Sequence, residues 1–358
     1  MKFLKYQRCT AQLLNYGDTV QVIIAGAGPV GLLLSLLLAR KGIRSKVFEK
    51  NPEPDTSPRA IVHHPPILEV FKDAGIYDLV SWRGNHSAGT YWRKHIVDDG
   101  NGGTVLGPVI AEMEISKRGE DGPFEDGKFS ILYMQSLQVQ LLLEEATKTS
   151  MVEVQFNTPV IGLEDDGNFV IVKVEAPEGP QLFRTHGHSW PESMIAADVQ
   201  RTLPNLEKFE AYFAVDKVHW GVVVPLEPIT PSKPGLWRYA MAVPDVALTN
   251  DEAGDPEYVH RLLLEYVDGP RPAEYTLVRH RVYPLHQLLA STMHRGRVLL
   301  AGDAGHVNNP VGGLGLSTGL LDAELLSQAL DLIFNHDYCN SQDLLAEYSA
   351  ARHQTTMS

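Results

Sequence analysis

A glycine-rich stretch near the start of the chain has the residue types that surround a bound phosphate group. The sequence GAGPVG at 26–31 lies between an apolar, strand-like run at 20–25 and an apolar, helix-like run at 32–39. Glycine lets the backbone approach a pyrophosphate, and the first turn of a helix offers unpaired N–H groups to an anion. Glu49 ends a second predicted strand eighteen residues after the last glycine, close to the spacing of about 20 for a carboxylate that binds ribose. The pattern predicts a site for the ADP half of a dinucleotide, and a carboxylate at this place favours NAD or FAD over NADP.

A second glycine-rich stretch, GDAGHVNNPVGGLGLSTG at 302–319, follows the apolar run at 297–301. Asp303 is therefore expected at the carboxyl end of a buried strand, where the ligands of open α/β sheets bind. The glycines lead into a predicted helix that begins near Leu316. A helix N-terminus stabilises negative charge, which a reduced flavin ring carries and a nicotinamide does not. This second stretch favours FAD over NAD.

These stretches need a strand–turn–helix–strand unit around the first glycines and a strand–helix unit around the second. Helical periodicity also occurs at 137–147, 316–334 and 341–353, and Gly75 predicts the end of another helix. Several runs within 211–282 alternate apolar and polar residues, as strands do. The predicted fold class is α/β, with an FAD-binding, Rossmann-like domain of the glutathione-reductase βαβ type, a β-rich substrate domain interleaved with it, and C-terminal helices.

The predicted domains are discontinuous in sequence. We expect an N-terminal extension at 1–19, an FAD-binding domain at 20–85, 128–200 and 283–335, a β-sheet substrate domain at 86–127 and 201–282, and a C-terminal helical tail at 336–358.

Composition and charge argue against several classes of protein. The chain has 358 residues and a net charge of −13 without a lysine or arginine cluster, so we expect no nucleic-acid partner. Its two cysteines, Cys9 and Cys339, have neither disulfide-framework nor zinc-site spacing, which predicts a reducing, cytoplasmic setting and no metal centre. Residues 1–19 lack the features of a signal peptide. The apolar stretch at 22–39 contains three glycines and a proline, which would break a membrane helix, so we expect no transmembrane segment.

Five motifs follow one another along the chain. They are VIIAGAGPVGLLLSLLLARKGIRSKVFEK at 22–50, SPRA at 57–60, LYMQSLQVQLLLEEA at 132–146, RVLLAGDAGHVNNPVGGLGLSTGLLDAELL at 297–326 and LLAEYSAAR at 344–352. This ordered set resembles the class A, single-component FAD-dependent monooxygenases, the family of para-hydroxybenzoate hydroxylase and phenol hydroxylase. The resemblance implies an FAD cofactor, NADH or NADPH as a transient reductant, a C4a-hydroperoxyflavin, and transfer of one oxygen atom from O2 to a small aromatic or enolic substrate. We expect a monomer or a homodimer.

The resemblance also implies which residues bind the cofactor. It assigns the FAD pyrophosphate to Gly26, Gly28 and Gly31, the adenosine ribose to Glu49, the cofactor lining to Arg59, Ala60 and Gln135, the ribityl or pyrophosphate part to Asp303, and the flavin ring edge to Pro310, Gly313, Leu314, Gly315 and Leu316.

Candidate catalytic residues come from the β-rich region. A group that favours the phenolate form of a phenol activates the ring for oxygen transfer. His219 and Tyr239 lie on two predicted strands and are the expected catalytic residues, with an ordinary core tyrosine as the alternative for Tyr239. The adjacent His63 and His64 receive no assignment.

Two other patterns in the sequence are set aside. GLSTG at 315–319 matches a hydrolase nucleophile motif but lacks the preceding strand. Asp303 and His306 lack the further ligands of a zinc site, so His306 is expected to pack and cap its turn.

One segment departs from the resembled family. The family's GADG-x-x-S-x-x-R turn serves the FAD pyrophosphate and the approach of NAD(P)H, and the corresponding run here is MIAADVQRTLPNL at 194–206. It retains Asp198, but Val199 replaces a glycine whose φ freedom the turn needs. Two functions therefore stay open: an FAD-dependent monooxygenase, or an FAD-binding protein with altered or lost NAD(P)H turnover that is a non-oxidative cyclase or isomerase, or is inactive. A third function, that of a dehydrogenase without oxygen chemistry, is less favoured.

Overall fold

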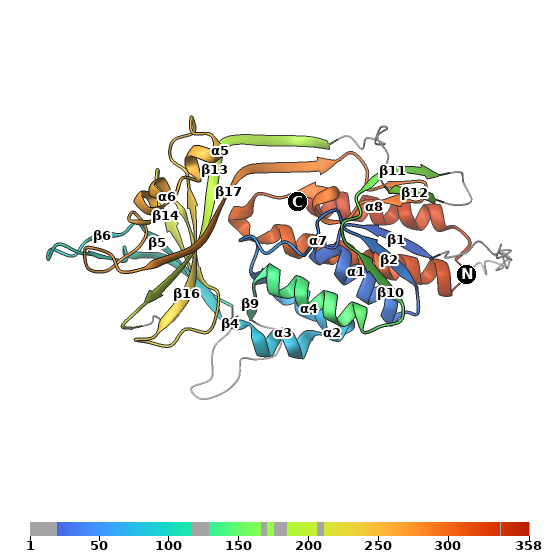
Figure 1. Cartoon of the computed structure of the whole chain (residues 1–358), viewed down its shortest axis with the longest axis horizontal. Coiled ribbons are helices and arrows are strands. Elements are labelled where there is room, and N and C mark those ends of the chain that lie inside the picture. Colours follow the sequence, from blue (N-terminus) through green and yellow to red (C-terminus); the bar gives the residue numbers. More distant parts are fainter. Residues whose placement is uncertain are drawn as a thin grey trace, which may run out of the picture.

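The protein has a helix-rich part and a part built on one large sheet (Figure 1). The computed structural model describes residues 20–115, 129–165, 170–174, 185–205, 211–336 and 338–357. The expected N-terminal extension at 1–19 lies outside the described residues. Within them the predicted α/β class is confirmed.

The helix-rich part begins with the predicted strand–helix–strand unit. Its elements are β1 (Val22–Ala25), α1 (Pro29–Arg40) and β2 (Ser45–Phe48), and β10 (Val152–Gln155) pairs with β2 to complete a three-stranded parallel sheet. Residues 32–38 of α1 are all buried, because this helix packs between α4 (Gln135–Thr147) and α7 (Leu314–Asn335). Among the described strands β1 pairs only with β2, and its free edge borders the cleft described below.

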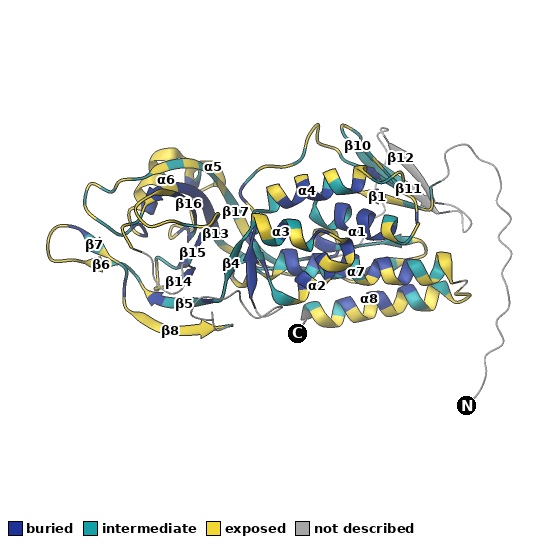
Figure 2. Cartoon of the chain, turned by 90° about the horizontal axis from the view of Figure 1, so that it is seen from below, coloured by how far each residue is buried: buried dark blue, intermediate teal, exposed yellow. Residues whose placement is uncertain are grey.

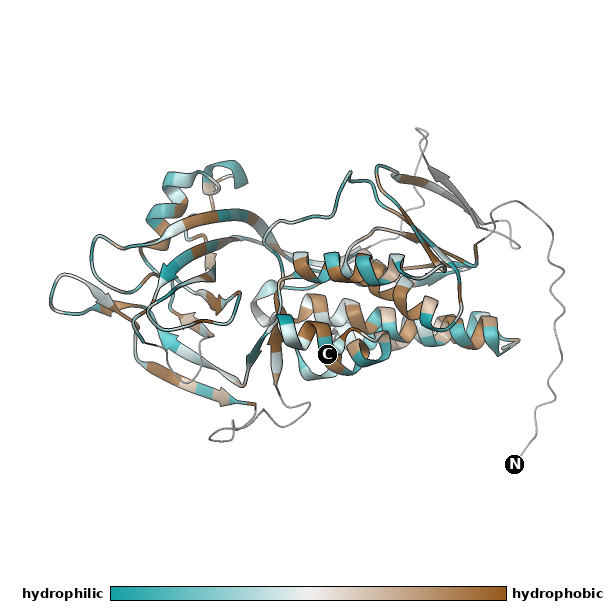
Figure 3. Ribbon diagram, turned by 60° about the horizontal axis from the view of Figure 1, so that its bottom comes forward, coloured by the Kyte–Doolittle hydropathy of each residue, from teal (hydrophilic) through white to brown (hydrophobic). Residues whose placement is uncertain are grey.

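Three further helices complete this part. They are α2 (Pro65–Ala74), α3 (Tyr77–Arg83) and α8 (Ser341–Met357). The prediction that a helix ends at Gly75 is confirmed, because Gly75 follows α2 with a φ of 72°, a value that favours glycine. Figure 2 shows α8 with exposed residues along its outer side, and Figure 3 shows polar and apolar residues interspersed along the helices. Such helices bury one side and solvate the other.

The structure corrects the buried strand predicted before Asp303. Only Val298–Leu299 form a strand there, β19, which pairs with the short β18 (His294–Arg295) and is half-buried. Gly302, with a φ of 60°, then begins a 3-10 turn at Gly302–Ala304. The strand therefore ends at Leu299, shortly before the glycine-rich turn begins at Gly302.

The large sheet has eight strands in the order β20-β17-β13-β16-β15-β14-β5-β8. In chain order these are β5 (Gly89–Lys94), β8 (Val109–Glu114), β13 (Thr185–Thr202), β14 (Tyr212–Val215), β15 (Gly221–Pro225), β16 (Pro234–Ala242), β17 (Thr276–Ala290) and β20 (His306–Val307). The helices α5 (Asn250–Ala253) and α6 (Pro256–Leu263) pack on one face, where an apolar core includes Tyr239, Met241, Val259 and Leu263.

Two long strands join the sheet to the helix-rich part. β13 and β17 are paired in antiparallel fashion from Thr185 and Ala290 at one end to Gln200 and Thr276 at the other, and they run side by side between the two parts (Figure 1). The domain boundaries expected at 200 and 282 fall inside these strands. The division into domains at those residues remains a prediction.

The remaining strands form small sheets. They are β3 (Val62–His63), β9 (Ser130–Leu132) and β4 (Asn85–Ser87) in one sheet, β6 (Val97–Asp98) with β7 (Thr104–Val105), and β11 (Val160–Asp165) with β12 (Val170–Val174). No helix within the described ranges is long and apolar enough to span a membrane. The apolar stretch at 22–39 is instead β1, a glycine turn and most of α1.

Candidate active site

A cleft of about 2430 Å³ lies where the two parts of the protein meet, and residues of both parts line it. This volume exceeds the roughly 300–1,000 Å³ of an ordinary small-molecule pocket. The cleft therefore has room for an extended cofactor and a second small molecule. Both glycine-rich stretches border it.

The first glycine turn leads directly into α1. Gly26 has a φ of 110°, and a Cβ atom on Gly31 would lie 2.1 Å from the carbonyl oxygen of Gly26, so both positions require glycine. Pro29 occupies the first turn of α1, where its missing N–H costs nothing. Nothing lies within 4 Å of a Cβ placed on Gly28. The open backbone and the helix N-terminus suit a pyrophosphate.

The second glycine turn packs against the first through Val30. A Cβ atom on Gly302 would lie 2.9 Å from Val30 Cγ2, and one on Gly319 would lie 2.8 Å from the same atom. Gly313 caps α7 with a φ of 64°. These close approaches place the N-termini of α1 and α7 on the same cleft, together with Asp303.

A buried polar network lies behind the second turn. The Asp322 carboxylate, on α7, accepts hydrogen bonds from Gly302 N at 2.7 Å and from Arg352 Nε, and its Oδ2 lies 2.7 Å from His306 Nε2. Arg352, on α8, also donates to Thr318 O at 3.1 Å. The expectation that His306 packs is confirmed, because its side chain is buried against Asp322, whereas the turn backbone is bonded by Asp322 and not by His306. This network holds the backbone of the Asp303 turn from behind.

The loop that contains Arg59 is fastened to the sheet. The Asp55 carboxylate accepts from Arg59 Nε at 3.0 Å and lies 3.5 Å from Arg281 Nη1, which also donates to Ser57 Oγ. Although burial raises the pKa of Asp55, the hydrogen bonds from Ser57 and Arg59 lower it to about 2. On the other side of the loop, Ala60 O accepts from Gln135 N at 3.0 Å. Arg59, Ala60 and Gln135 therefore belong to one fixed wall of the cleft.

Asp198 lies in the middle of β13 and not in a turn, which corrects the sequence-based expectation for this segment. Its fully buried carboxylate accepts from Arg238 Nε and from Arg279 Nε, both at 2.7 Å. Val199 is a buried strand residue in the core between the sheet and α6. A branched side chain favours a strand, so Val199 causes no strain there. The segment that raised doubt about NAD(P)H turnover is thus part of a strand. Its partner Arg238, on the neighbouring strand β16, also donates to Arg59 O.

Most of the predicted cofactor residues meet at the cleft. Its lining includes Gly26, Gly28, Gly31, Arg59, Ala60, Gln135, Asp303, Pro310, Gly313, Gly315 and Leu316. Leu314 is outside the lining and 52 % exposed. Glu49 is also outside the lining, and its carboxylate accepts from Ala27 N and Asn51 N, both at 2.9 Å. Glu49 thereby braces the glycine turn at the end of β2.

The predicted catalytic residues, Tyr239 and His219, lie outside the cleft lining. Tyr239 is 1 % exposed in the core between the sheet and α6, and its hydroxyl accepts from Arg201 Nη1 at 2.7 Å. Because side chains alternate along a strand, its neighbours Arg238 and Ala240 face the cleft instead. His219 is outside the lining and lies 5.2 Å from the ring of His95. The sequence alone did not reveal which face of this strand lines the cleft and which packs in the core.

The sheet contributes an aromatic wall that the sequence did not single out. Trp92 on β5 and Phe213 on β14 are directly paired, and their rings stack at 5.4 Å with an angle of 8°. Both line the cleft. Of the two adjacent histidines, His63 is buried against Phe71, while His64 lines the cleft. Burial lowers the pKa of His64, and its Nε2 atom is buried without a hydrogen-bond partner.

The comparisons with known proteins agree with this geometry. A family model described as "FAD binding domain" matches residues 19–183 and 181–358. The chain belongs to this FAD-binding family. The two matched segments meet just before β13, the strand that contains Asp198.

Relatives of this FAD-binding protein are monooxygenases. It is 31 % identical to the para-nitrophenol 4-monooxygenase of Pseudomonas sp. (strain WBC-3), over 92 % of this chain and 82 % of the relative. It is 29 % identical to the 6-hydroxy-3-succinoylpyridine 3-monooxygenase HspB of Pseudomonas putida (strain DSM 28022 / S16), over 93 % and 84 % of the two chains. The crystal structure of p-nitrophenol 4-monooxygenase PnpA from Pseudomonas putida DLL-E4 has a TM-score of 0.79 and 29 % identity, covering 94 % of this chain and 85 % of that one.

The family and these relatives identify the protein as an FAD-dependent monooxygenase of the aromatic-hydroxylase type. The comparisons do not favour the alternative of a non-oxidative cyclase, isomerase or inactive protein. In the structure Asp198 and Val199 are residues of β13, so no turn at this point needs the glycine that Val199 replaces.

Proposed function

We propose that this monooxygenase hydroxylates a small, single-ring aromatic compound that carries a hydroxyl group, with NADH or NADPH as reductant and O2 as the oxygen source. One observation carries the proposal: two helix N-termini and Asp303 border a cleft whose other wall contains the stacked Trp92 and Phe213. The names of the relatives support the substrate class, since they refer to para-nitrophenol, a hydroxypyridine and a 3-(3-hydroxy-phenyl)propionate.

The residues present fit FAD. Gly26, Gly28 and Gly31 leave the backbone open before α1, and we assign the pyrophosphate to them. Glu49 is assigned to the adenosine ribose through its position at the end of β2, and Asp303 to the ribityl or pyrophosphate part. The first turn of α7, at Gly313–Leu316, is assigned to the flavin ring edge. When bound, FAD supplies reduction by NAD(P)H and activation of O2.

The cofactor lining and the substrate wall have separate assignments. Arg59, Ala60 and Gln135 are held by hydrogen bonds on one side of the cleft, and they orient the cofactor. Trp92 and Phe213 offer flat apolar surfaces for an aromatic ring. His64 offers a ring nitrogen to the substrate hydroxyl, because burial lowers its pKa and leaves Nε2 unpartnered. A neutral imidazole accepts a hydrogen bond from the substrate hydroxyl, which increases the electron density of the ring. His64 replaces Tyr239 and His219 in this role.

The decisive experiment measures substrate-dependent NAD(P)H oxidation and O2 uptake by the purified protein with bound FAD. Para-nitrophenol and 3-(3-hydroxyphenyl)propionate are the first substrates to test. Trp92→Leu is expected to raise KM by about tenfold, the equivalent of one aromatic contact, and to retain flavin. The matched control is Trp82→Leu, because Trp82 is 83 % exposed and outside the cleft.

A colourless protein that FAD does not reconstitute would overturn the proposal. Oxidation of NAD(P)H that no aromatic compound stimulates would overturn the substrate class. We also propose that the protein is a monomer or a homodimer and that it is cytoplasmic. Light scattering measures the quaternary state.

A further inference from the structure

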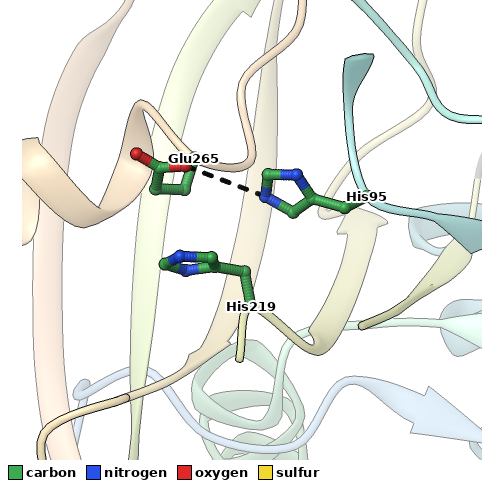
Figure 4. A group of neighbouring side chains, drawn as sticks. All are labelled: His95, His219 and Glu265. Carbon is green, nitrogen blue, oxygen red and sulfur yellow. Dashed lines mark ion pairs between the residues drawn. The ribbon is translucent and has the colours of Figure 1, made fainter. Parts of the chain in front are cut away.

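A second group of reactive side chains lies in the sheet-based part, outside the cleft. His95 follows β5, His219 lies in the turn between β14 and β15, and Glu265 follows α6 (Figure 4). One ligand-type atom from each of the three lies within 4.8 Å of the others. The His95 Nε2 and Glu265 Oε2 atoms are 4.0 Å apart. None of the three residues lines the cleft.

Each histidine has a buried ring nitrogen without a hydrogen-bond partner. These atoms are His95 Nε2 and His219 Nδ1. The other nitrogen of His95, Nδ1, lies 3.1 Å from Ile96 O. A carbonyl oxygen only accepts, so Nδ1 donates to it and Nε2 is the ring nitrogen left for another partner. A buried polar atom without a partner costs free energy, and a cation between these two nitrogens and the Glu265 carboxylate would contact all three groups.

We propose that His95, His219 and Glu265 bind a divalent transition-metal ion, with Zn²⁺ as the simplest occupant. Two imidazoles and a carboxylate are a zinc donor set that leaves a fourth position for water. Tetrahedral zinc with bonds of about 2.0–2.2 Å needs ligand atoms about 3.3–3.5 Å apart. The three side chains therefore have to approach by roughly 1 Å, which rotation of the half-exposed Glu265 side chain allows.

Neighbouring groups hold both histidines in place. Hydrogen bonding of Nδ1 to a backbone carbonyl is the usual way that a metal-binding imidazole is oriented, and His95 has this bond. The Asp216 carboxylate accepts from Val218 N at 2.8 Å and from His219 N at 2.9 Å, which fixes the turn before β15. The Tyr266 ring stands edge-on to both imidazoles, with centroids 6.2 Å away.

The proposed ion would join three segments that are far apart in sequence. It links the end of β5, the β14–β15 turn and the end of α6. A ligand that binds only the folded state stabilises that state by mass action. The ion is therefore structural, and the proposal is independent of the proposed hydroxylation.

Titration of the full-length, FAD-loaded protein with Zn²⁺ and with Co²⁺ tests the site. We expect one Zn²⁺ per chain, a higher unfolding temperature with Zn²⁺ than with EDTA, and the visible absorption of tetrahedral Co²⁺. Glu265→Gln and His219→Gln should each weaken Zn²⁺ binding by more than about 100-fold, because loss of even an outer-shell partner costs 10–100-fold. The control is His260→Gln, which removes an exposed histidine of the same part that lies beside Tyr275. Flavin absorbance and NAD(P)H oxidation should be equal in all four proteins.

Two results would overturn the site. One is a parent protein that binds no Zn²⁺, which would leave His95 and Glu265 as a plain ion pair. The other is Zn²⁺ binding that Glu265→Gln and His219→Gln leave as tight as in His260→Gln. Circular dichroism of the variants distinguishes lost binding from lost folding.

Discussion

Asp198 and Arg238 lie directly opposite each other on neighbouring strands, and Arg238 Nε donates to Asp198 Oδ1 over 2.7 Å. Arg279 binds the other carboxylate oxygen from the strand on the opposite side. The two arginines also bind the loop that contains Arg59: Arg238 donates to Arg59 O, and Arg279 donates to Thr56 O. The buried Asp198 carboxylate therefore holds this loop through both arginines. Asp198 is thus a positioning residue for the cofactor wall.

Asp198→Asn should therefore destabilise the protein and loosen this loop. Removal of one partner from a buried ion pair costs about 3–5 kcal/mol, and chemical denaturation measures it. FAD affinity should fall as well. The control is Glu69→Gln, which breaks the exposed pair with Lys72 and should cost less than about 1 kcal/mol. Equal stability of the two variants would refute the positioning role.

Two glycines of the first turn should respond differently to alanine. Gly31→Ala places a methyl group 2.1 Å from Gly26 O, so the free energy of unfolding should fall by about 3 kcal/mol, at the upper end of overpacking costs. Gly28 has a φ of −75°, which any residue adopts, and no atom lies within 4 Å of the position that the Cβ atom of Gly28→Ala would take. This variant should fold like the parent and lose FAD affinity, because the methyl group enters the cleft. Thermal unfolding without FAD and a flavin titration separate the two effects.

Tyr239→Phe should reduce stability and leave turnover unchanged. The hydroxyl is buried and accepts from Arg201, which also binds Asp268 at 2.8 Å. Loss of a hydrogen bond to a charged group costs about 1.5–3 kcal/mol. A fall in the hydroxylation rate of about tenfold or more, as loss of a general base produces, would restore Tyr239 as a catalytic candidate.

His63 should make the protein less stable in acid. Burial lowers the pKa of His63 from 6.5 to about 4, so between these values the unfolded chain binds a proton that the folded protein does not. Stability should therefore fall as the pH drops from 6.5 to 4, by roughly 3 kcal/mol. His63→Gln should flatten the dependence of the unfolding free energy on pH in this window. An unchanged slope would exclude His63 as the cause.

The local features of the cofactor site were predictable from sequence because each depends on neighbouring residues. The glycines at 26–31 and 313–315 lie within a few residues of the start of a helix, and Gly75 directly follows the end of one. The run before Asp303 was predicted as a full buried strand, but hydrophobicity does not say whether a partner strand is present. Only β18 pairs with it among the described strands.

Features that depend on which strands become neighbours were not predictable. Asp198 resembled a turn residue because its partners, Arg238 and Arg279, are 40 and 81 positions away. Alternation along the strand defined two faces without saying which one meets the cleft, and Tyr239 is on the face that packs against the core. The pairing of Trp92 with Phe213 and the meeting of His95 with His219 likewise arise only when β5 lies beside β14.

The shared length of β13 and β17 limits how the enzyme can open and close. A hinge needs a few residues free to change their dihedral angles, whereas here a hydrogen-bonded two-strand ladder crosses from one part to the other. The ladder is irregular between Ser189 and Ser193 and between Asp198 and Val199. Bending of the two strands would concentrate at these two interruptions, so the sheet would bend elastically next to the cleft. A large rotation of one part against the other would break hydrogen bonds between β13 and β17.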